Sequence, residues 1–169
     1  MSRAALRFAA IFIAGIIVFS VVLSLDVVNE RLIVPFTGLI ASASSVTLNL
    51  FGLATSVAGT QIVGGTGFAV NILNGCNGIY VTAILVSAVL AYPSTAKEKL
   101  LGLALGIPGI QLVNLVRIVS LYYIGLTRPD LFDDFHLYIW QTAVIVLSMG
   151  IWIFWAEVLV GRKRAAPSR

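Results

Sequence analysis

Long apolar runs separated by short polar breaks dominate this chain. Four runs are long enough to cross a membrane as helices, which takes about 17 to 25 residues, and they cover residues 8–25, 76–92, 100–124 and 137–159. Pro108 predicts a kink in the third run, and Gly125 is expected to end it. The first run is long for a signal peptide and lacks a clear cleavage site, so we interpret it as a transmembrane helix.

Residues 32–53 form a fifth apolar stretch, but six Ser, Thr and Asn residues interrupt it. If this stretch crossed the membrane, Lys97 and Lys99 would lie outside the cell, although basic residues tend to stay in the cytoplasm. We therefore expect either an amphipathic helix in the outer interface or a re-entrant hairpin. Both alternatives fit the sequence equally well.

Residues 56–72 are rich in Val, Ile, Thr and Gly, which predicts two short strands in an extraplasmic β-hairpin. Because an unpaired sheet edge cannot face lipid, we expect the hairpin to lie above the bilayer or against protein. The pattern thus predicts an all-α polytopic membrane protein with about four transmembrane helices, an interfacial or re-entrant helix and this hairpin.

Composition supports a single membrane-embedded domain over residues 1–169. Hydrophobic residues make up 59% of the chain and charged residues 11%, against about 25% charged residues in soluble domains. The net charge of +4 comes from basic residues near the ends of the apolar runs and in residues 160–169, which we interpret as a basic cytoplasmic tail. The basic residues form no stripe, so we expect membrane lipid and no nucleic acid as a partner.

The only cysteine and the only histidine both fall at the ends of apolar runs. Cys76 begins the second run and His136 precedes the fourth. Arg117 lies inside the third run, where a charged side chain is costly unless it faces protein or water. In the predicted topology all three lie near the outer membrane face, which predicts a common site. One cysteine forms no intrachain disulfide, and without a Cys/His cluster we expect no metal and no cofactor.

The chemistry of these three side chains suits a nucleophilic cysteine. A thiol at a helix N-terminus and near a cation is favoured in its thiolate form. Histidine can donate a proton to a leaving amine, and arginine can hold a carbonyl oxygen as negative charge develops there.

Four polar neighbours are expected to support the site. Gln111 and Asn114 recur at three-residue spacing with Arg117, which places them on one side of the same helix. Asn74 and Asn77 flank the cysteine. The alternative is that the helix residues are interhelical hydrogen-bonding groups and that Arg117 pairs with a lipid phosphate or with an aspartate of residues 130–134.

Three short motifs occur in one order along the chain. Residues 74–79 read Asn-Gly-Cys-Asn-Gly-Ile, residues 114–118 read Asn-Leu-Val-Arg-Ile, and residues 135–136 read Phe-His. Together they resemble the exosortase/archaeosortase family of membrane-embedded cysteine transpeptidases, with its patterns Cys-Ser/Asn-Gly-Ile, Asn-x-x-Arg-Ile and a His before the last helix. The resemblance covers residues 37–155, and in size the chain resembles the compact exosortase H type.

The resemblance implies a sorting enzyme of a bacterial inner membrane, with its active site facing the periplasmic side. Its substrates would be exported proteins with a C-terminal signal made of a short motif, a transmembrane helix and a basic cluster. Cys76 would be the nucleophile that forms a thioester, His136 the general acid and base, and Arg117 the oxyanion or thiolate partner. The acyl group would pass to an acceptor amine or to water.

A function from another class is also compatible with the residues. A non-enzymatic transporter subunit or assembly factor would use Arg117 to bind an anionic ligand or lipid, and Cys76 would then be dispensable. Thiol reactivity of Cys76 distinguishes the two readings.

Overall fold

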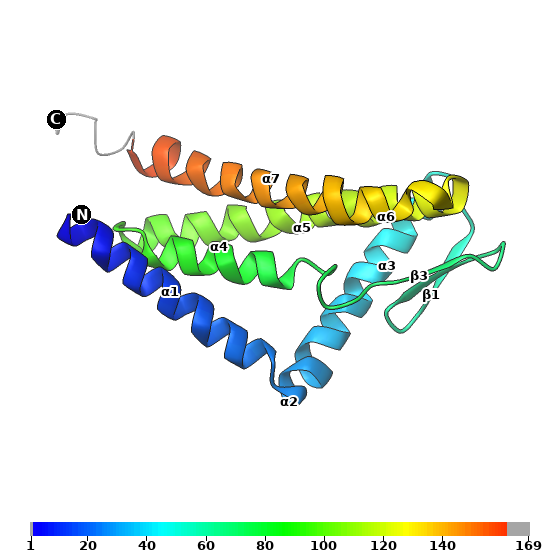
Figure 1. Ribbon diagram of the computed structural model, residues 1–169, viewed down its shortest axis with the longest axis horizontal. Helices are drawn as coiled ribbons and strands as arrows, with labels where there is room; N and C mark the ends of the chain where they lie inside the picture. The colour runs from blue at the N-terminus through cyan, green and yellow to red at the C-terminus, as the bar shows by residue number, and fades with distance from the viewer. Residues whose placement is uncertain (1, 162–169) are drawn as a thin grey trace.

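The computed structural model describes residues 2–161, which form a mostly helical protein with one small antiparallel sheet. Three helices, α4 (Ile79–Ala91), α5 (Ala96–Thr127) and α7 (Gln141–Ile153), run side by side, and α1 (Arg3–Leu23) packs against α4 (Figure 1). The predicted fold class is confirmed. All but the first two residues of the predicted basic tail, 160–169, lie outside the described residues.

The last apolar run belongs to a longer helical segment than predicted. It begins at η2 (Pro129–Leu131), α6 (Phe132–Asp134) and η3 (Phe135–Trp140), continues through α7 and ends in η4 (Phe154–Gly161). The whole segment is 33 residues long and apolar enough to span a membrane. His136 therefore lies inside a helical segment rather than in a loop before it.

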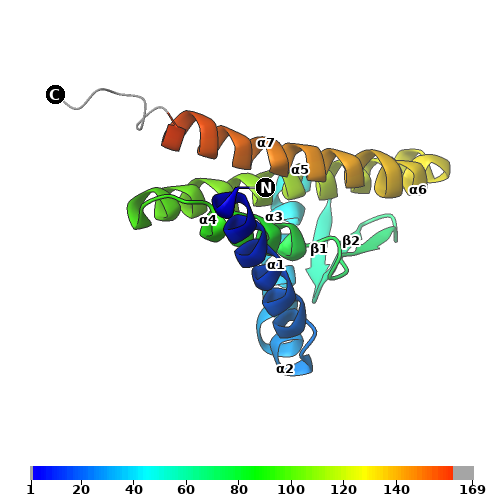
Figure 2. The ribbon, with the colours of Figure 1, turned by 60° about the vertical axis from the view of Figure 1, so that its left-hand side comes forward.

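Residues 32–53 do not form a hairpin. A single unbroken helical segment, which we call the oblique helical segment, is made by α2 (Asp26–Val28), η1 (Asn29–Ile33) and α3 (Val34–Leu50). It leaves the end of α1 at a sharp angle (Figures 1 and 2). By length and hydropathy this 25-residue segment is one of four that can cross a membrane, whereas α4 has only 13 residues. The sequence pattern predicted a full span at residues 76–92, where the helix has only 13 residues, and no full span at residues 32–53, where the helical segment has 25.

The sheet has three strands rather than the two expected. The strands β1 (Thr55–Ala58), β2 (Gln61–Gly64) and β3 (Ala69–Asn71) follow each other in the order β1-β2-β3 with antiparallel pairing. Gly59 and Gly67 have φ angles of 63° and 84°, which only glycine adopts easily, and they form the two turns. The sheet packs against α3 and α5 through a core of fully or nearly buried residues: Ala41, Leu48, Ile62, Ile72, Ile118 and Tyr122.

The helix α5 does not end at Gly125 as predicted. It begins with a capping box between Thr95 and Glu98, continues through Pro108 and ends at Thr127, just before the Arg128–Pro129 pair. A proline disfavours helical backbone in the residue before it, which explains the end. Gly125 is required by packing rather than by the helix end, because a Cβ atom there would lie 2.6 Å from the ring of Phe68.

The basic ends of α1 and α5 meet at the end of the bundle opposite the sheet (Figure 1). Arg3 and Arg7 of α1 and Lys99 of α5 line one cavity of about 430 Å³ there. At the same end, Trp155 Nε1 donates a hydrogen bond to the Glu98 carbonyl oxygen at 2.9 Å, which ties η4 to the start of α5. Arg3, Arg7 and Lys99 thus share one end, which fits the positive-inside pattern, whereas Arg31 and Arg128 lie elsewhere in the fold.

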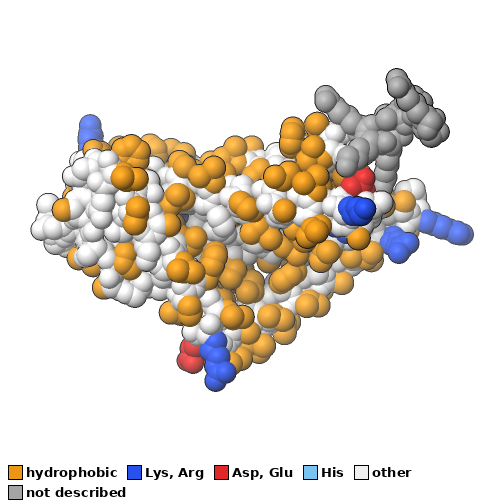
Figure 3. All heavy atoms as spheres, turned by 180° about the vertical axis from the view of Figure 1, so that it is seen from behind, with side chains coloured by type: hydrophobic (Ala, Val, Ile, Leu, Met, Phe, Trp, Pro, Cys, Tyr) orange, Lys and Arg blue, Asp and Glu red, His pale blue; other side chains and the backbone are white. Residues whose placement is uncertain are grey.

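The outer surface of the helices is apolar. No residue of α1 is buried, and large side chains such as Ile13, Leu112 and Val146 are more than half exposed. In Figure 3 hydrophobic side chains cover the face along the helices, while Lys and Arg gather at its extremities. Such a surface is unusual for a soluble monomer and suits contact with lipid. The chain is a multi-pass membrane protein.

Candidate active site

The cysteine lies in a turn between the sheet and α4. The Cys76 N–H donates to the Leu73 carbonyl oxygen at 2.8 Å, and Gly78 adopts a left-handed φ of 76° before α4 begins at Ile79. Cys76 is thus three residues ahead of the helix rather than its first residue, which corrects the predicted start. The helix begins late because the left-handed Gly78 redirects the chain.

The structure brings Cys76, Arg117 and His136 together from three separate segments. Cys76 Sγ lies 3.2 Å from His136 Nε2, and an Nη atom of Arg117 donates toward the same sulfur at 3.7 Å. The cysteine comes from the turn, the arginine from α5 and the histidine from η3. A base within hydrogen-bond reach of a thiol, with a fixed cation beside it, is the geometry that a thiol nucleophile requires.

These three side chains open into one cavity of about 520 Å³. Its wall is mostly apolar, and it includes the whole of β3, the end of α5 and the start of the last helical segment. Phe132 lies beside the imidazole, with 5.7 Å between the ring centroids. The size and lining suit a ligand with an extended apolar part and one polar reacting group.

Arg117 is 4% exposed, and the described residues provide it with no carboxylate partner. Among the described residues the only hydrogen bond of its guanidinium is the one to Cys76 Sγ, and its Nε has none. The alternative pairing with an aspartate of residues 130–134 is not present in the structure, although Asp133 lines the cavity. No anion of the described residues neutralises the guanidinium, so its positive charge remains available to a ligand in the cavity. Burying an unpaired charge in this way is costly.

Two asparagines attach the cysteine turn to the oblique helical segment. Asn77 is fully buried; its Nδ2 donates to Thr37 Oγ1 at 2.9 Å, and its Oδ1 accepts from the Ile79 N–H at 3.1 Å. Asn74 Nδ2 donates to Asn29 Oδ1 at 2.8 Å. These bonds join the cysteine turn to the helical segment of residues 26–50.

Gln111 and Asn114 lie on the side of α5 that faces the turn. A Cβ atom on Gly78 would meet the Gln111 amide at 3.1 Å and Asn114 Cγ at 3.3 Å, so only glycine fits there easily. Gln111 Nε2 donates to Thr82 Oγ1 at 3.2 Å. Asn114 is 1% exposed, and neither amide atom has a hydrogen-bond partner. Gln111 thus joins α5 to α4, whereas Asn114 does not.

Sequence reasoning missed the residues that support the site from a distance. Asn29 and Thr37 are more than 35 positions away from the turn, and a polar residue in an apolar run does not reveal its partner. Phe132 is apolar, so the search for polar residues in apolar runs did not find it. No cluster of three or more potential metal ligands occurs within residues 2–161.

Comparison with known proteins identifies a family. The family model described as transmembrane exosortase (Exosortase_EpsH) matches residues 2–156, which is most of the chain. No curated protein and no solved structure matches the chain.

Proposed function

Because this chain belongs to the transmembrane exosortase family, we propose that it cleaves the C-terminal sorting signal of exported proteins through a covalent thioester on Cys76. Membership implies a protease that processes sorting signals. The observation that supports a cysteine mechanism is the contact of one thiol with both an imidazole at 3.2 Å and a guanidinium at 3.7 Å inside a cavity.

In the first half of the reaction Cys76 Sγ attacks the carbonyl carbon of the scissile peptide bond. The thiol proton passes to His136 Nε2 as the S–C bond forms. His136 then gives this proton to the nitrogen of the leaving segment as the C–N bond breaks. Arg117 holds the carbonyl oxygen while it carries negative charge.

In the second half an acceptor amine or water attacks the thioester. The incoming nucleophile loses a proton to His136 Nε2, the C–S bond breaks, and the proton returns to Cys76 Sγ. Transfer to an amine makes the protein a transpeptidase, and transfer to water makes it a protease.

The arrangement of the chain supports a site on the outer side of a bacterial inner membrane. The basic ends of α1 and α5 lie at the end of the bundle opposite the sheet and the cavity. If the basic end faces the cytoplasm, the cavity opens toward the compartment that receives exported proteins. The substrates would carry a short motif, a transmembrane helix and a basic cluster.

The test is co-expression with an exported protein that carries such a C-terminal signal and is encoded in the same genome. We expect wild type to remove the C-terminal helix of this substrate. Cys76→Ala should abolish removal, His136→Ala should slow it by about 100-fold or more, and Arg117→Ala by about 100- to 1000-fold.

The matched control is Arg128→Ala, because Arg128 follows the same helix but is exposed and does not line the cavity. This variant should process the substrate like wild type. Normal processing by Cys76→Ala would exclude the cysteine mechanism. Equal losses in Arg117→Ala and Arg128→Ala would exclude a specific role for Arg117.

Thiol labelling separates the enzyme from a non-enzymatic membrane protein. Cys76 is the only cysteine, so a maleimide reports on this residue alone. We expect labelling to stop processing completely, since the labelled sulfur cannot attack. A labelled protein that retains its full cellular function would favour a transporter subunit or assembly factor.

A further inference from the structure

The free edge of β3 carries backbone groups without partners. Phe68 accepts a hydrogen bond from Gly64, and Ile72 donates one to Thr60, so the even-numbered residues of this strand pair with β2. In an antiparallel pair the intervening residues turn their N–H and C=O groups the other way. The backbone groups of Ala69 and Asn71 therefore point away from β2, and within residues 2–161 no recorded bond satisfies them.

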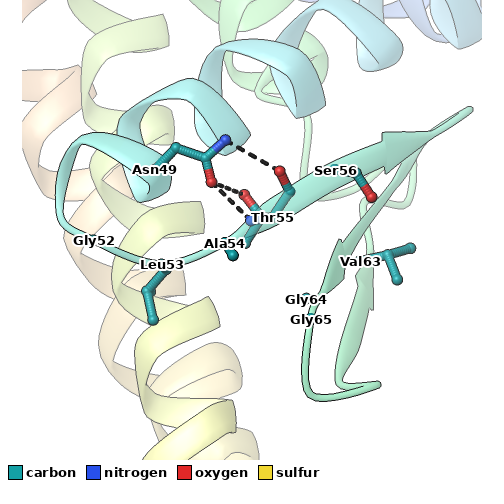
Figure 4. A pocket seen from close by; sticks show the side chains of 9 residues that line it. All are labelled: Asn49, Gly52, Leu53, Ala54, Thr55, Ser56, Val63, Gly64 and Gly65. Carbon is teal, nitrogen blue, oxygen red and sulfur yellow. Dashed lines mark hydrogen bonds between the residues drawn. The ribbon is translucent and has the colours of Figure 1, made fainter.

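The opposite edge of the same sheet is covered at one of its two outward-facing residues. On β1 the outward-facing residue Thr55 is covered by Asn49, whose side chain accepts from the Thr55 N–H at 2.7 Å and donates to its carbonyl oxygen at 3.1 Å. Figure 4 shows this amide lying along the strand as a neighbouring backbone would. A partner on a sheet edge satisfies backbone groups that could otherwise pair with another chain, and β3 has no such partner within residues 2–161 at either outward-facing residue.

The uncovered edge lies in the wall of the cavity that holds the cysteine. Residues 68–73, which include all of β3, line the same cavity as Cys76, Arg117 and His136. The chain passes from Asn71 to Cys76 within five residues. A second strand laid along β3 would therefore run beside the sulfur atom.

We propose that the edge of β3 binds the substrate as an added strand, which presents the scissile carbonyl to Cys76. The occupant is an extended segment of the exported protein next to its cleavage site, so this inference rests on the proposed function. The N–H and C=O groups of Ala69 and Asn71 supply up to four hydrogen bonds that do not depend on the side chains of the substrate. Selection among substrates would then come from side chains that enter the apolar cavity.

Proline substitution tests the edge directly. Ala69→Pro removes an outward-facing N–H and places a ring on the free edge but removes no bond to β2, because proline is tolerated on a strand edge. Ala69→Val adds similar bulk and keeps the N–H. We expect Ala69→Pro to process the co-expressed substrate at least about tenfold more slowly than Ala69→Val, since a hydrogen bond is lost and the ring blocks the edge.

Val57→Pro is the matched control at the other edge. Val57 also turns its backbone groups away from β2, but it does not line the cavity. We expect this variant to process like wild type. In all variants the rate of maleimide labelling of Cys76 should stay within about twofold of wild type, which shows that the site is assembled.

A second measurement applies if Ala69→Pro disturbs folding. Synthetic peptides that span the cleavage site of the processed substrate are N-methylated at successive residues and offered to the detergent-solubilised wild type. Strand addition predicts losses at every second residue, because only alternate N–H groups face the enzyme strand.

The inference is overturned if Ala69→Pro, with normal labelling, processes like Ala69→Val, or if N-methylation shows no two-residue alternation. Neither result affects the proposed function, which stands as long as wild type cleaves and Cys76→Ala does not. If wild type cleaves no substrate, both proposals fail.

Discussion

The bond between Asn77 and Thr37 provides a test of how the oblique helical segment supports the site. Thr37→Val keeps the shape of the side chain and removes its hydroxyl. In the structure this hydroxyl donates to the Ile33 carbonyl oxygen at 2.8 Å and accepts from Asn77 Nδ2 at 2.9 Å. Both Thr37 and Asn77 are fully buried, so water cannot easily replace the lost partner.

The magnitude follows from the group that remains. The Ile33 carbonyl is part of a helix, so the loss of the hydrogen bond from the Thr37 hydroxyl matters little there. Asn77 Nδ2, by contrast, becomes a buried donor without an acceptor. Such a group costs about 1–3 kcal/mol, and no cavity adds to this cost because valine fills the same volume. With roughly 2–4 °C per kcal/mol for a chain of this size, the thermal midpoint should fall by about 4–8 °C for a cost near 2 kcal/mol.

The assay is thermal unfolding of the detergent-solubilised protein, followed by tryptophan fluorescence, with processing of the co-expressed substrate measured in parallel. The matched control is Thr47→Val, because Thr47 lies on the same helix and its hydroxyl reaches only the Ala43 carbonyl oxygen. We expect the control to unfold near the wild-type midpoint. Equal midpoints for the two variants would refute the view that this bond holds the cysteine turn.

Three further substitutions test other contacts of the fold and the site. Gly125→Ala should lower stability by about 1–2 kcal/mol because the added methyl group meets two phenylalanine rings of the cavity wall, whereas Gly150→Ala, with nothing within 4 Å, should be neutral or stabilising in the same thermal assay. Trp155→Phe should cost about 0.5–1.5 kcal/mol more than Trp152→Phe, since only the first indole has a hydrogen-bond partner. Asn114→Leu should preserve or raise the thermal midpoint while processing of the co-expressed substrate falls.

The sequence predicted the three polar groups of the site because each is rare or costly where it stands. A buried arginine in an apolar run and a single Cys and His at the ends of two others are unusual enough to indicate a common location. Proximity followed from topology, since alternate crossings bring the ends of successive helices to one face. What topology could not predict is the contact distance between the thiol and the imidazole.

The supporting contacts were beyond prediction for a physical reason. Thr37 satisfies its own hydroxyl within its helix, as threonine often does, so its sequence context indicates no long-range partner. The third strand has only three residues, too few for an alternating pattern. The late start of α4 depends on the left-handed backbone of Gly78. The sequence alone does not predict whether a glycine adopts a positive or a negative φ, so this start could not be predicted.

Replacing Asn114 is expected to change the stability and the activity of this protein in opposite directions. Both of its amide atoms are buried without partners, and such groups typically cost 1–3 kcal/mol in a folded protein. Leucine has nearly the same shape and would remove this cost, so selection for stability alone would favour it. A buried polar group without partners in a native structure calls for an explanation, and a catalytic role is one such explanation. Asn114 lies one helical turn from Arg117 and against Gly78 of the cysteine turn, which places the uncompensated amide where it can orient the site. If Asn114→Leu gained stability and kept full processing, the amide would be only a packing defect.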